Sequence, residues 1–354
     1  MKFHNKLINW YLENARELPW RDTQEPYPIW LSEIMLQQTR IQQGLPYFLK
    51  FIKAFPTVFD LAKASEDKVL KLWQGLGYYS RARNLHFTAK YVAYELNGIF
   101  PTTYKDLKNL KGVGDYTASA IASFCYQEPV AVVDGNVYRA LSRYFGIDTP
   151  INSTEGIKEF KTLAEKLLDK EQPDIYNQAI MEFGALQCTP KSPDCAVCPL
   201  QIDCVAFRQS LVESLPRKLK KTKVLERHYN YIVILDSREN VFLEKRTGKG
   251  IWKNLFQFPL IESSKSCETS EDLLMSNDKI LPQNILREAS LYNAKPIKHL
   301  LSHRKLWVKF WIVEVEKLNL VENLPKSLLI TNQIDTFAVP VVIQKFIEAY
   351  GFSK

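Results

Sequence analysis

The chain has 354 residues, of which 46% are hydrophobic, and this length favours two domains with separate cores. Lysine and arginine number 47 against 39 acidic residues, and the resulting formal net charge of +8 agrees with a polyanionic partner without requiring one. The first 16 residues carry an acid and no apolar core, so we expect no secretory signal peptide. The densest apolar runs, at 231–235 and 310–313, are far shorter than the ~20 residues of a membrane helix. We therefore expect an intracellular protein without membrane contact.

Residues 1–210 predict a mostly helical region. Apolar residues recur there at three- and four-residue steps, and breaks fall where glycine and proline occur. The segment 215–227 that follows contains six basic residues and one acid. It predicts a solvated linker, and a strap that contacts phosphates is the alternative.

After the linker the pattern changes to that of a smaller α+β domain. Stretches rich in β-branched and aromatic residues at 229–236, 240–246 and 305–316 predict strands. Helical patterns near 281–292 and 339–349 complete the domain. We expect a helical domain at 1–214, the linker at 215–227 and the α+β domain at 228–354.

Four cysteines at short spacing form the strongest motif of the chain, Cys188-x6-Cys195-x2-Cys198-x5-Cys204. Thiolates this close in sequence can surround one metal centre, and zinc and an iron–sulfur cluster both accept four of them. Spacing alone does not separate the two. No flavin or haem motif lies nearby, which favours a structural role over a redox relay. Cys125 and Cys267 lie outside the motif.

The stretch 110–119, LKGVGDYTAS, contains Gly112, Val113 and Gly114 before a helical pattern. A dinucleotide-binding fold would need a buried strand before the first glycine, and the polar, helix-like 104–111 does not provide one. A helix–hairpin–helix is the better interpretation, because the backbone N–H groups of the turn and the positive end of the second helix can face a DNA phosphate. Such a contact positions DNA without reading its sequence.

Two carboxylates stand in contrasting surroundings. Glu33 lies within the apolar helical pattern of 30–39, where burial would raise its pKa and keep it protonated. Asp134 precedes another helical pattern, and we expect the helix N-terminus to keep its carboxylate charged. One acid and one anion suit the cleavage of a glycosidic bond through an oxocarbenium-like transition state.

Together these motifs resemble the MutY family of adenine DNA glycosylases. The resemblance covers about 1–215 in order, and its remaining quoted segments are 19–21, 75–85, 132–143 and 176–188. It implies a helix–hairpin–helix glycosylase fold and one [4Fe–4S] cluster on Cys188, Cys195, Cys198 and Cys204. Residues 228–354 resemble the Nudix-like lesion-recognition domain, without an intact set of metal-binding carboxylates.

The resemblance implies roles for individual residues. Glu33 would protonate adenine, Asp134 would stabilise the sugar cation, and Tyr116 and Asn136 would hold that carboxylate. Gly112, Val113 and Gly114 would contact a phosphate, and Ser302 and His303 would sense the lesion. Residues expected to bind the substrate DNA and its flipped adenine elsewhere are Arg16, Trp20, Arg21, Leu36, Gln37, Gln38, Thr39, Tyr78 and Gln178, with Gln38 and Tyr78 as wedges in the duplex.

These residues distinguish the expected activity from its rivals. Endonuclease III, a similar family, has at the position of Tyr116 a lysine that forms a Schiff base with the sugar, which a phenol cannot do. We therefore expect a monofunctional enzyme that acts on double-stranded DNA containing 8-oxoguanine:A or G:A and leaves an abasic site. The alternatives are a bifunctional glycosylase–lyase and a non-catalytic iron–sulfur DNA-binding module. Asp115 and Leu301 depart from the family pattern. We expect a monomer in the cytoplasm or nucleoid of a bacterium.

Overall fold

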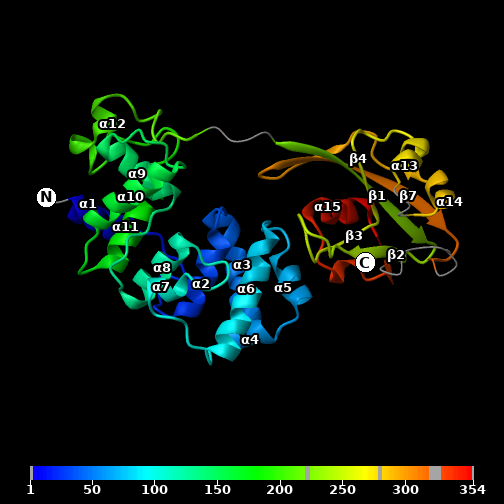
Figure 1. Cartoon of the computed structure of the whole chain (residues 1–354), viewed down its shortest axis with the longest axis horizontal. Coiled ribbons are helices and arrows are strands. Elements are labelled where there is room, and N and C mark those ends of the chain that lie inside the picture. The colour runs from blue at the N-terminus through cyan, green and yellow to red at the C-terminus, as the bar shows by residue number, and fades with distance from the viewer. Residues whose placement is uncertain (1–2, 220–223, 278–280, 319–327, 353–354) are drawn as a thin grey trace. The chain divides into compact units, whose positions relative to one another are not determined.

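The computed structural model describes residues 3–219, 224–277, 281–318 and 328–352 (Figure 1). The chain divides into two compact units, one of residues 1–63 and 84–221 and the other of residues 64–83 and 222–354. The main division lies inside the basic segment expected as a linker, of which 220–223 fall outside the described residues. The sequence did not indicate that 64–83 belong to the second unit. The domain limits 1–214 and 228–354 stay a prediction.

The first unit is helical, as the periodicity predicted. Its regular segments in the described residues are α1 (Phe3–Asn14), α2 (Pro26–Leu36), α3 (Ile41–Ala54), α4 (Val58–Lys63), the second half of α6 (Tyr79–Lys90), a π-helical turn (Tyr91–Glu95), α7 (Tyr104–Leu107), α8 (Asp115–Tyr126), α9 (Gly135–Phe145), α10 (Thr154–Leu167), α11 (Pro173–Leu186), a 3-10 turn (Gln201–Asp203) and α12 (Val205–Arg208).

Local sequence explains where several of these helices begin. Pro26 and Pro173 occupy the first positions of α2 and α11, where the missing N–H of proline costs no hydrogen bond. Ser153 caps α10, since its hydroxyl accepts from the N–H of Gly156 over 2.9 Å. The helix α2 is apolar on nearly all sides, and eight of its residues are buried, so it lies inside the unit rather than on its surface.

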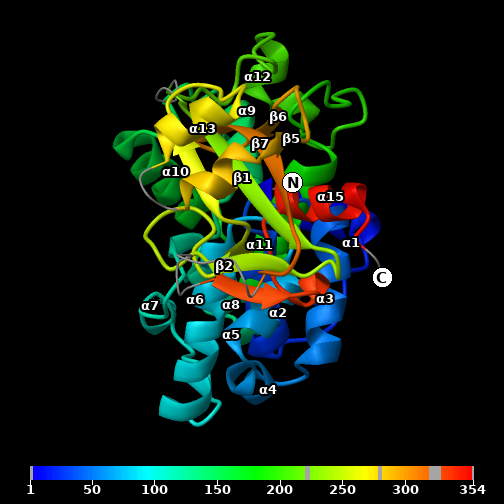
Figure 2. The same cartoon turned by 90° about the vertical axis from the view of Figure 1, so that its right-hand side faces the viewer.

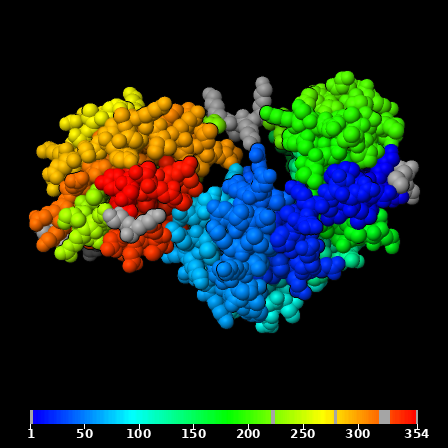
Figure 3. Space-filling model, turned by 180° about the vertical axis from the view of Figure 1, so that it is seen from behind, coloured from blue at the N-terminus to red at the C-terminus, as the bar shows by residue number. Residues whose placement is uncertain are grey.

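The core next to the cysteine segment joins helices that are far apart in sequence. Leu7 of α1, Val137 of α9, Phe160 of α10 and Tyr176 of α11 pack in one hydrophobic cluster. In the space-filling view the blue N-terminal helix lies against green segments from the second half of the unit (Figure 3). This packing fixes the start of the chain against α11, which carries part of the site described below.

The second unit is built on one mixed sheet with helices on both faces (Figure 2). Its regular segments in the described residues are α5 (Glu66–Trp73), the first half of α6, β1 (Leu225–Asp236), β2 (Val241–Lys245), β3 (Phe256–Gln257), β4 (Leu260–Ser263), α13 (Ser270–Ser276), α14 (Gln283–Arg287), β5 (Ser290–Leu291), β6 (Ile297–Leu300), β7 (Arg304–Val315), β8 (Leu328–Thr331), a 3-10 turn (Ile334–Thr336) and α15 (Val341–Tyr350).

The alternation of side chains along β7 explains how the helices cover this sheet. β1 and β7 pair in parallel along their whole length, from Leu225 opposite Arg304 to Asp236 opposite Val315. Phe310 stacks on Phe346 of α15 with 4.0 Å between ring centroids, whereas Trp311 packs in the cluster that includes α13 and α14. Because neighbouring residues of a strand face opposite sides, α15 covers one face of the sheet and α13 with α14 the other.

The three predicted strands and the C-terminal helix are confirmed, and one prediction was wrong in part. The helix expected over 281–292 is limited to Gln283–Arg287, and Ser290–Leu291 pairs with β7 instead. Pairing with the edge of the sheet competes with helix formation at these residues, and hydrophobic periodicity alone does not reveal that alternative. No helix in the described part of the chain is long and apolar enough to cross a membrane.

Candidate active site

A cavity of about 660 Å³ in the helical unit brings together side chains from the loop before α2 and from α2, α8, α9 and α11. Its lining includes most of the catalytic and substrate-binding residues expected from the sequence. These are Arg16, Trp20, Arg21, Glu33, Leu36, Gln38, Thr39, Tyr116, Asp134, Asn136 and Gln178. The cavity therefore joins residues of five segments that the sequence could only consider one by one.

Glu33 lies on α2 with 6% of its surface exposed. Burial raises the pKa of its carboxyl group to about 7, while the hydrogen bond with Tyr116 opposes the rise, the charge of Asp134 adds to it and the charge of Arg21 opposes it. The expected rise is thus present. A carboxyl group with this pKa can donate a proton near neutral pH.

Tyr116 occupies a place different from the one expected. Its hydroxyl group hydrogen-bonds to Glu33, and Asp134 acts on it only through charge. Burial raises the pKa of the phenol well above its ordinary value, so Tyr116 remains neutral. In this structure the hydroxyl group of Tyr116 is hydrogen-bonded to Glu33, whereas the resemblance implied a contact with Asp134.

Asp134 caps α9, as its position before the helical pattern indicated. Its carboxylate accepts three hydrogen bonds, from the backbone N–H of Asn136 (2.8 Å), the backbone N–H of Val137 (2.8 Å) and the side-chain amide of Asn136 (2.7 Å). We expected the helix terminus to favour the charged form. Burial is the larger effect and raises the pKa of Asp134, while the hydrogen bonds from Val137 and Asn136 at the helix terminus favour the charged form, as expected, and oppose that rise. The expected contact between Asn136 and this carboxylate is present.

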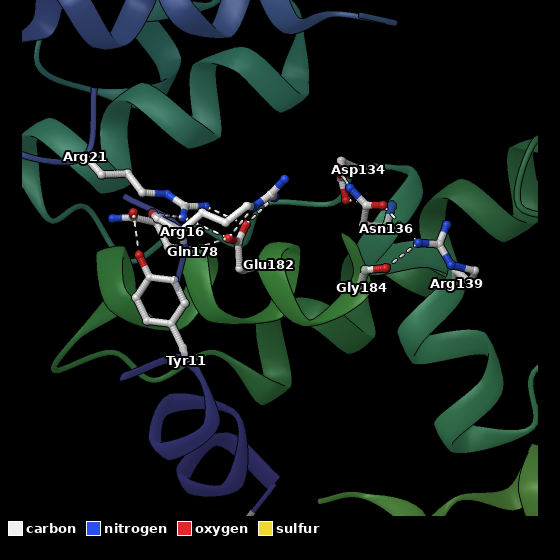
Figure 4. Close-up of polar contacts among 9 residues, drawn as sticks. All are labelled: Tyr11, Arg16, Arg21, Asp134, Asn136, Arg139, Gln178, Glu182 and Gly184. Atoms are coloured by element: carbon white, nitrogen blue, oxygen red, sulfur yellow. Dashed lines mark hydrogen bonds and ion pairs between the residues drawn. The ribbon is translucent and has the colours of Figure 1, made fainter. Parts of the chain in front are cut away.

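An ion cluster around the buried Glu182, which the sequence did not reveal, lines part of the cavity. Its polar contacts are drawn in Figure 4. Glu182 of α11 accepts from the guanidinium of Arg16 over 2.7 and 2.6 Å and from that of Arg21 over 3.1 and 2.7 Å. Burial opposes ionisation of Glu182, but the hydrogen bonds from the two arginines lower its pKa to about 2. Glu182 follows Gln178 by one helical turn, and this i, i+4 spacing is the signal that could have identified it.

Gln178 has a defined orientation. Its side-chain oxygen accepts from the hydroxyl group of Tyr11 over 3.0 Å (Figure 4). The guanidinium of Arg21 lies 5.6 Å from the centroid of the same tyrosine ring. Tyr11 therefore connects Gln178 with the ion cluster, and nothing in its local sequence pointed to that role.

The residues that follow α2 form a strained turn. Gln38 has a φ of 56°, a conformation that non-glycine residues seldom adopt. The side-chain amide of Gln37 donates to Thr117 Oγ1 of α8 over 3.1 Å, which ties this turn to the helix that carries Tyr116. Gln38 and Thr39 line the cavity. Tyr78, the second expected wedge residue, also has a positive φ, of 47°, and backbone strain of this kind is common at functional sites.

The predicted hairpin lies between α7 and α8. Gly112 has a φ of 86°, and a Cβ atom there would meet Asn84 Cβ at 2.8 Å. Gly114 has an extended backbone and open space around it, so only the first glycine is required by the turn. Asp115 hydrogen-bonds to Tyr104 and pairs with Lys108 (3.4 Å) and Lys161 (3.8 Å). These lysines offset the negative charge that this departure introduces beside the hairpin.

Tyr78 and the lesion-sensing candidates belong to the second unit. The hydroxyl groups of Tyr78 and Ser302 hydrogen-bond to each other. Ser302 and His303 are exposed in the turn between β6 and β7, and Leu301 is partly buried there. The structure thus brings Tyr78 and Ser302 together, although the sequence separates them by 224 positions.

The four cysteines of the motif line a small cavity of about 30 Å³ beside α9 and α11. Within the described ranges, no three His, Cys, Asp or Glu side chains are placed to hold a single metal ion. A structural zinc ion needs its sulfur ligands at ~2.3 Å from one point, whereas an iron–sulfur cluster distributes them over several irons. Four cysteine side chains around one small cavity suit a metal centre, and both zinc and an iron–sulfur cluster accept four such ligands.

Two buried arginines of α9 surround this segment. Arg143 donates to Cys188 Sγ over 3.4 Å and to the carbonyl of Thr189 over 2.7 Å. Arg139 donates to the carbonyl of Cys188 over 2.7 Å and to Asn136 Oδ1 over 2.9 Å. Because Asn136 in turn contacts Asp134, hydrogen bonds run from the cysteine segment to the capping carboxylate, part of them visible in Figure 4.

Comparison with known proteins identifies the family of the chain. Residues 31–167 match the HhH-GPD superfamily of base excision DNA repair proteins, and residues 230–349 match the NUDIX domain. An adenine DNA glycosylase of Buchnera aphidicola (subsp. Baizongia pistaciae) is 35% identical over 348 residues, which cover 98% of this chain and 95% of that protein. The chain belongs to the MutY family of adenine DNA glycosylases.

Other relatives support the same family and fold. The human adenine DNA glycosylase is 32% identical over 98% of this chain and 74% of its own length. Among solved structures, a thermostable thymine-DNA glycosylase matches with a TM-score of 0.54 and 28% identity over 58% of this chain and 95% of its own. An endonuclease III–DNA complex, 20% identical, matches with a TM-score of 0.52 over 59% of this chain and 94% of its own, and shows the fold alone. The expected MutY membership and fold class are confirmed.

Proposed function

We propose that this MutY-family chain hydrolyses the N-glycosidic bond of adenine paired with 8-oxoguanine or guanine in double-stranded DNA and leaves an abasic site. The observation that carries the proposal is the shared cavity of Glu33 and Asp134. The proposal is supported by the carboxyl group of Glu33, whose pKa is about 7, and the hydrogen-bonded carboxylate of Asp134, which border the same space. Two carboxyl groups in these roles cleave glycosidic bonds.

In the reaction that we propose, adenine leaves the base stack and enters the cavity. Glu33, oriented by Tyr116, donates its proton to N7 of the base, which makes adenine a better leaving group. Asp134 then stabilises the positive charge that develops on the sugar, while Asn136 holds its carboxylate. Water adds to the sugar and completes the hydrolysis.

The proposed recognition of adenine uses the walls of the same cavity. Gln178 and Arg16 offer polar groups to the edges of the base, and Trp20 and Leu36 offer apolar surface. Gln38 and Tyr78 would wedge into the duplex where the base has left or beside the lesion. The remaining substrate contacts that we propose are those of Arg21, Gln37 and Thr39, with a DNA phosphate on Gly112, Val113 and Gly114.

We assign Ser302 and His303 to the recognition of the lesion opposite adenine. Their exposure in the turn between β6 and β7 and the contact of Ser302 with Tyr78 support this role. We also propose that Cys188, Cys195, Cys198 and Cys204 hold one [4Fe–4S] cluster, which would fix the fold of the segment between α11 and α12. A monomeric state and a location in the bacterial cytoplasm or nucleoid stay predictions.

A gel assay tests the reaction. The duplex carries one 8-oxoguanine:A pair with the adenine strand labelled, and the product is analysed with and without alkali. Breaks at the adenine that require alkali support a monofunctional glycosylase. Breaks without alkali indicate a glycosylase–lyase, and intact strands would reject catalysis. Wild-type protein should give no borohydride-trapped complex, because Tyr116 has no amine.

Lesion recognition is tested separately. His303→Ala should lower the ratio of single-turnover rates on 8-oxoguanine:A and G:A duplexes. Lys298→Ala, which removes an exposed polar side chain from the adjoining strand β6, is the control. An unchanged ratio in the His303 variant would remove this residue from lesion sensing without affecting the glycosylase assignment.

A further inference from the structure

The inference concerns Glu182, a buried carboxylate that the proposed reaction does not use. Its side chain is 2% exposed, against 35% for that of Arg16 and 16% for that of Arg21. It accepts five hydrogen bonds, three from Arg16, including its backbone N–H at 3.1 Å, and two from Arg21. An anion so enclosed must be compensated, and the two guanidinium groups do this.

The geometry explains why both arginines remain in the wall of the cavity. Arg16 and Arg21 lie in the loop between α1 and α2, where regular hydrogen bonds do not fix the side chains. Arg21 Nη1 also donates to the carbonyl of Arg16 over 3.0 Å, so Arg21 supports the backbone of the loop at Arg16 (Figure 4). Bidentate contacts to one rigid helix residue hold the planar guanidinium groups in fixed orientations.

The contact between Glu182 and Arg21 concerns Glu33 as well, because the charge of Arg21 affects the pKa of Glu33. Besides burial, the groups that change the pKa of Glu33 are Tyr116 of α8, Asp134 at the start of α9 and Arg21 in the loop. The charge of Glu33 in turn raises the pKa of Cys125 of α8, which burial raises more strongly. Arg21 is the cation of this set, and it favours the ionised form of Glu33. A proton donor needs the opposite, because only its protonated form can act.

We propose that Glu182 is a positioning residue that holds Arg16 and Arg21 in the wall of the adenine pocket and balances the charge that Arg21 directs at Glu33. The inference rests on the proposed function, since it concerns the acid of that reaction, whose proton is retained mainly through burial, an effect that the charge of Arg21 opposes. Gln178 and Glu182 lie one turn apart on the same face of α11. In this proposal Gln178 binds the base, and Glu182 binds the two arginines.

The test is the pH dependence of single-turnover adenine release from an 8-oxoguanine:A duplex, measured between about pH 6 and about pH 9. In Glu182→Gln the charge of Arg21 is no longer offset, so Glu33 loses its proton more easily. The alkaline limb of the profile should move toward acid by about one pH unit, which lowers the rate about tenfold on the alkaline side. Glu182→Asp keeps the charge and should keep the limb in place.

Two further variants complete the design. Arg21→Gln removes the cation and should move the limb toward alkaline pH, which keeps the proposal testable if Glu182→Gln does not fold. Glu171→Gln removes the same charge from an exposed site just before α11 and should leave the limb unchanged. The proposal would be overturned if Glu182→Gln and Arg21→Gln both lost rate equally at every pH and kept the alkaline limb of the profile at its wild-type position. If wild-type protein releases no adenine, the proposed function fails instead.

Discussion

The hydroxyl group of Tyr11 donates to the side-chain oxygen of Gln178 over 3.0 Å. The amide of Gln178 is therefore oriented, and its NH₂ group remains for an acceptor atom of a bound base. Tyr11→Phe deletes this one hydrogen bond and leaves the ring in place. We expect a loss of about 1 kcal/mol in transition-state stabilisation, roughly a fivefold lower single-turnover rate constant.

The matched control for Tyr11→Phe is Tyr94→Phe, which changes an exposed tyrosine of the same unit. It should leave the rate unaltered. Equal rates for wild type and Tyr11→Phe would show that Gln178 needs no orientation by Tyr11.

Glu33→Gln should lower the activity and raise the stability of the protein above neutral pH. Because burial raises the folded-state pKa to about 7 from an ordinary 4.5, the stabilising effect of Glu33 is complete below about pH 4.5 and is lost as the pH rises through about 7. The variant should therefore gain about 3 kcal/mol in the free energy of unfolding at about pH 8 and little at about pH 4. Adenine release should fall by at least ~10²-fold.

Chemical denaturation at the two pH values measures the first effect, and single-turnover assays measure the second. Glu17→Gln, at an exposed position, is the control for both. A stability difference that does not change with pH would mean that Glu33 is not the titrating group.

The hairpin glycines give a paired test. Gly112→Ala places a Cβ 2.8 Å from Asn84 Cβ in a backbone with a φ of 86°, so we expect destabilisation of at least about 1–2 kcal/mol and weaker DNA binding. Gly114→Ala, with an extended backbone and nothing within 4 Å of the added atom, should keep its stability. Thermal unfolding and duplex titration of both variants measure the difference, and equal losses would contradict the requirement for Gly112.

The cysteine segment predicts an iron content that depends on its own thiols. Cys204→Ser should lose iron and visible absorbance, whereas Cys125→Ser, outside the segment, should retain both. Elemental analysis for iron and zinc on purified protein decides between the two centres. Zinc in the wild-type protein, without iron, would reject the cluster.

Much of the site followed from local sequence, because local sequence determines which helix faces are apolar. The apolar pattern around Glu33 predicted its burial, and burial is the main cause of its raised pKa. The place of Asp134 before a helical pattern predicted the cap. The four cysteines are close enough in sequence to meet in almost any fold.

Other features needed the folded chain. Tyr116 contacts Glu33 rather than Asp134, and the pKa of Asp134 rises despite three hydrogen bonds, because packing rather than position in a helix decides the burial of each group. The helix expected over 281–292 is short because part of it pairs with β7. Glu182 and Arg16 are 166 positions apart, and no local pattern connects them.

By itself, the sequence determined which chemical groups this protein has and which helix or turn carries each, since hydrophobic periodicity, caps and turn residues act over a few positions. The tertiary structure alone decided which of those groups touch. The contact of Tyr11 with Gln178 and that of Glu182 with two arginines arise from the packing of α11 against the start of the chain. Charges and hydrogen bonds depend on distance in space, and only the folded core sets that distance.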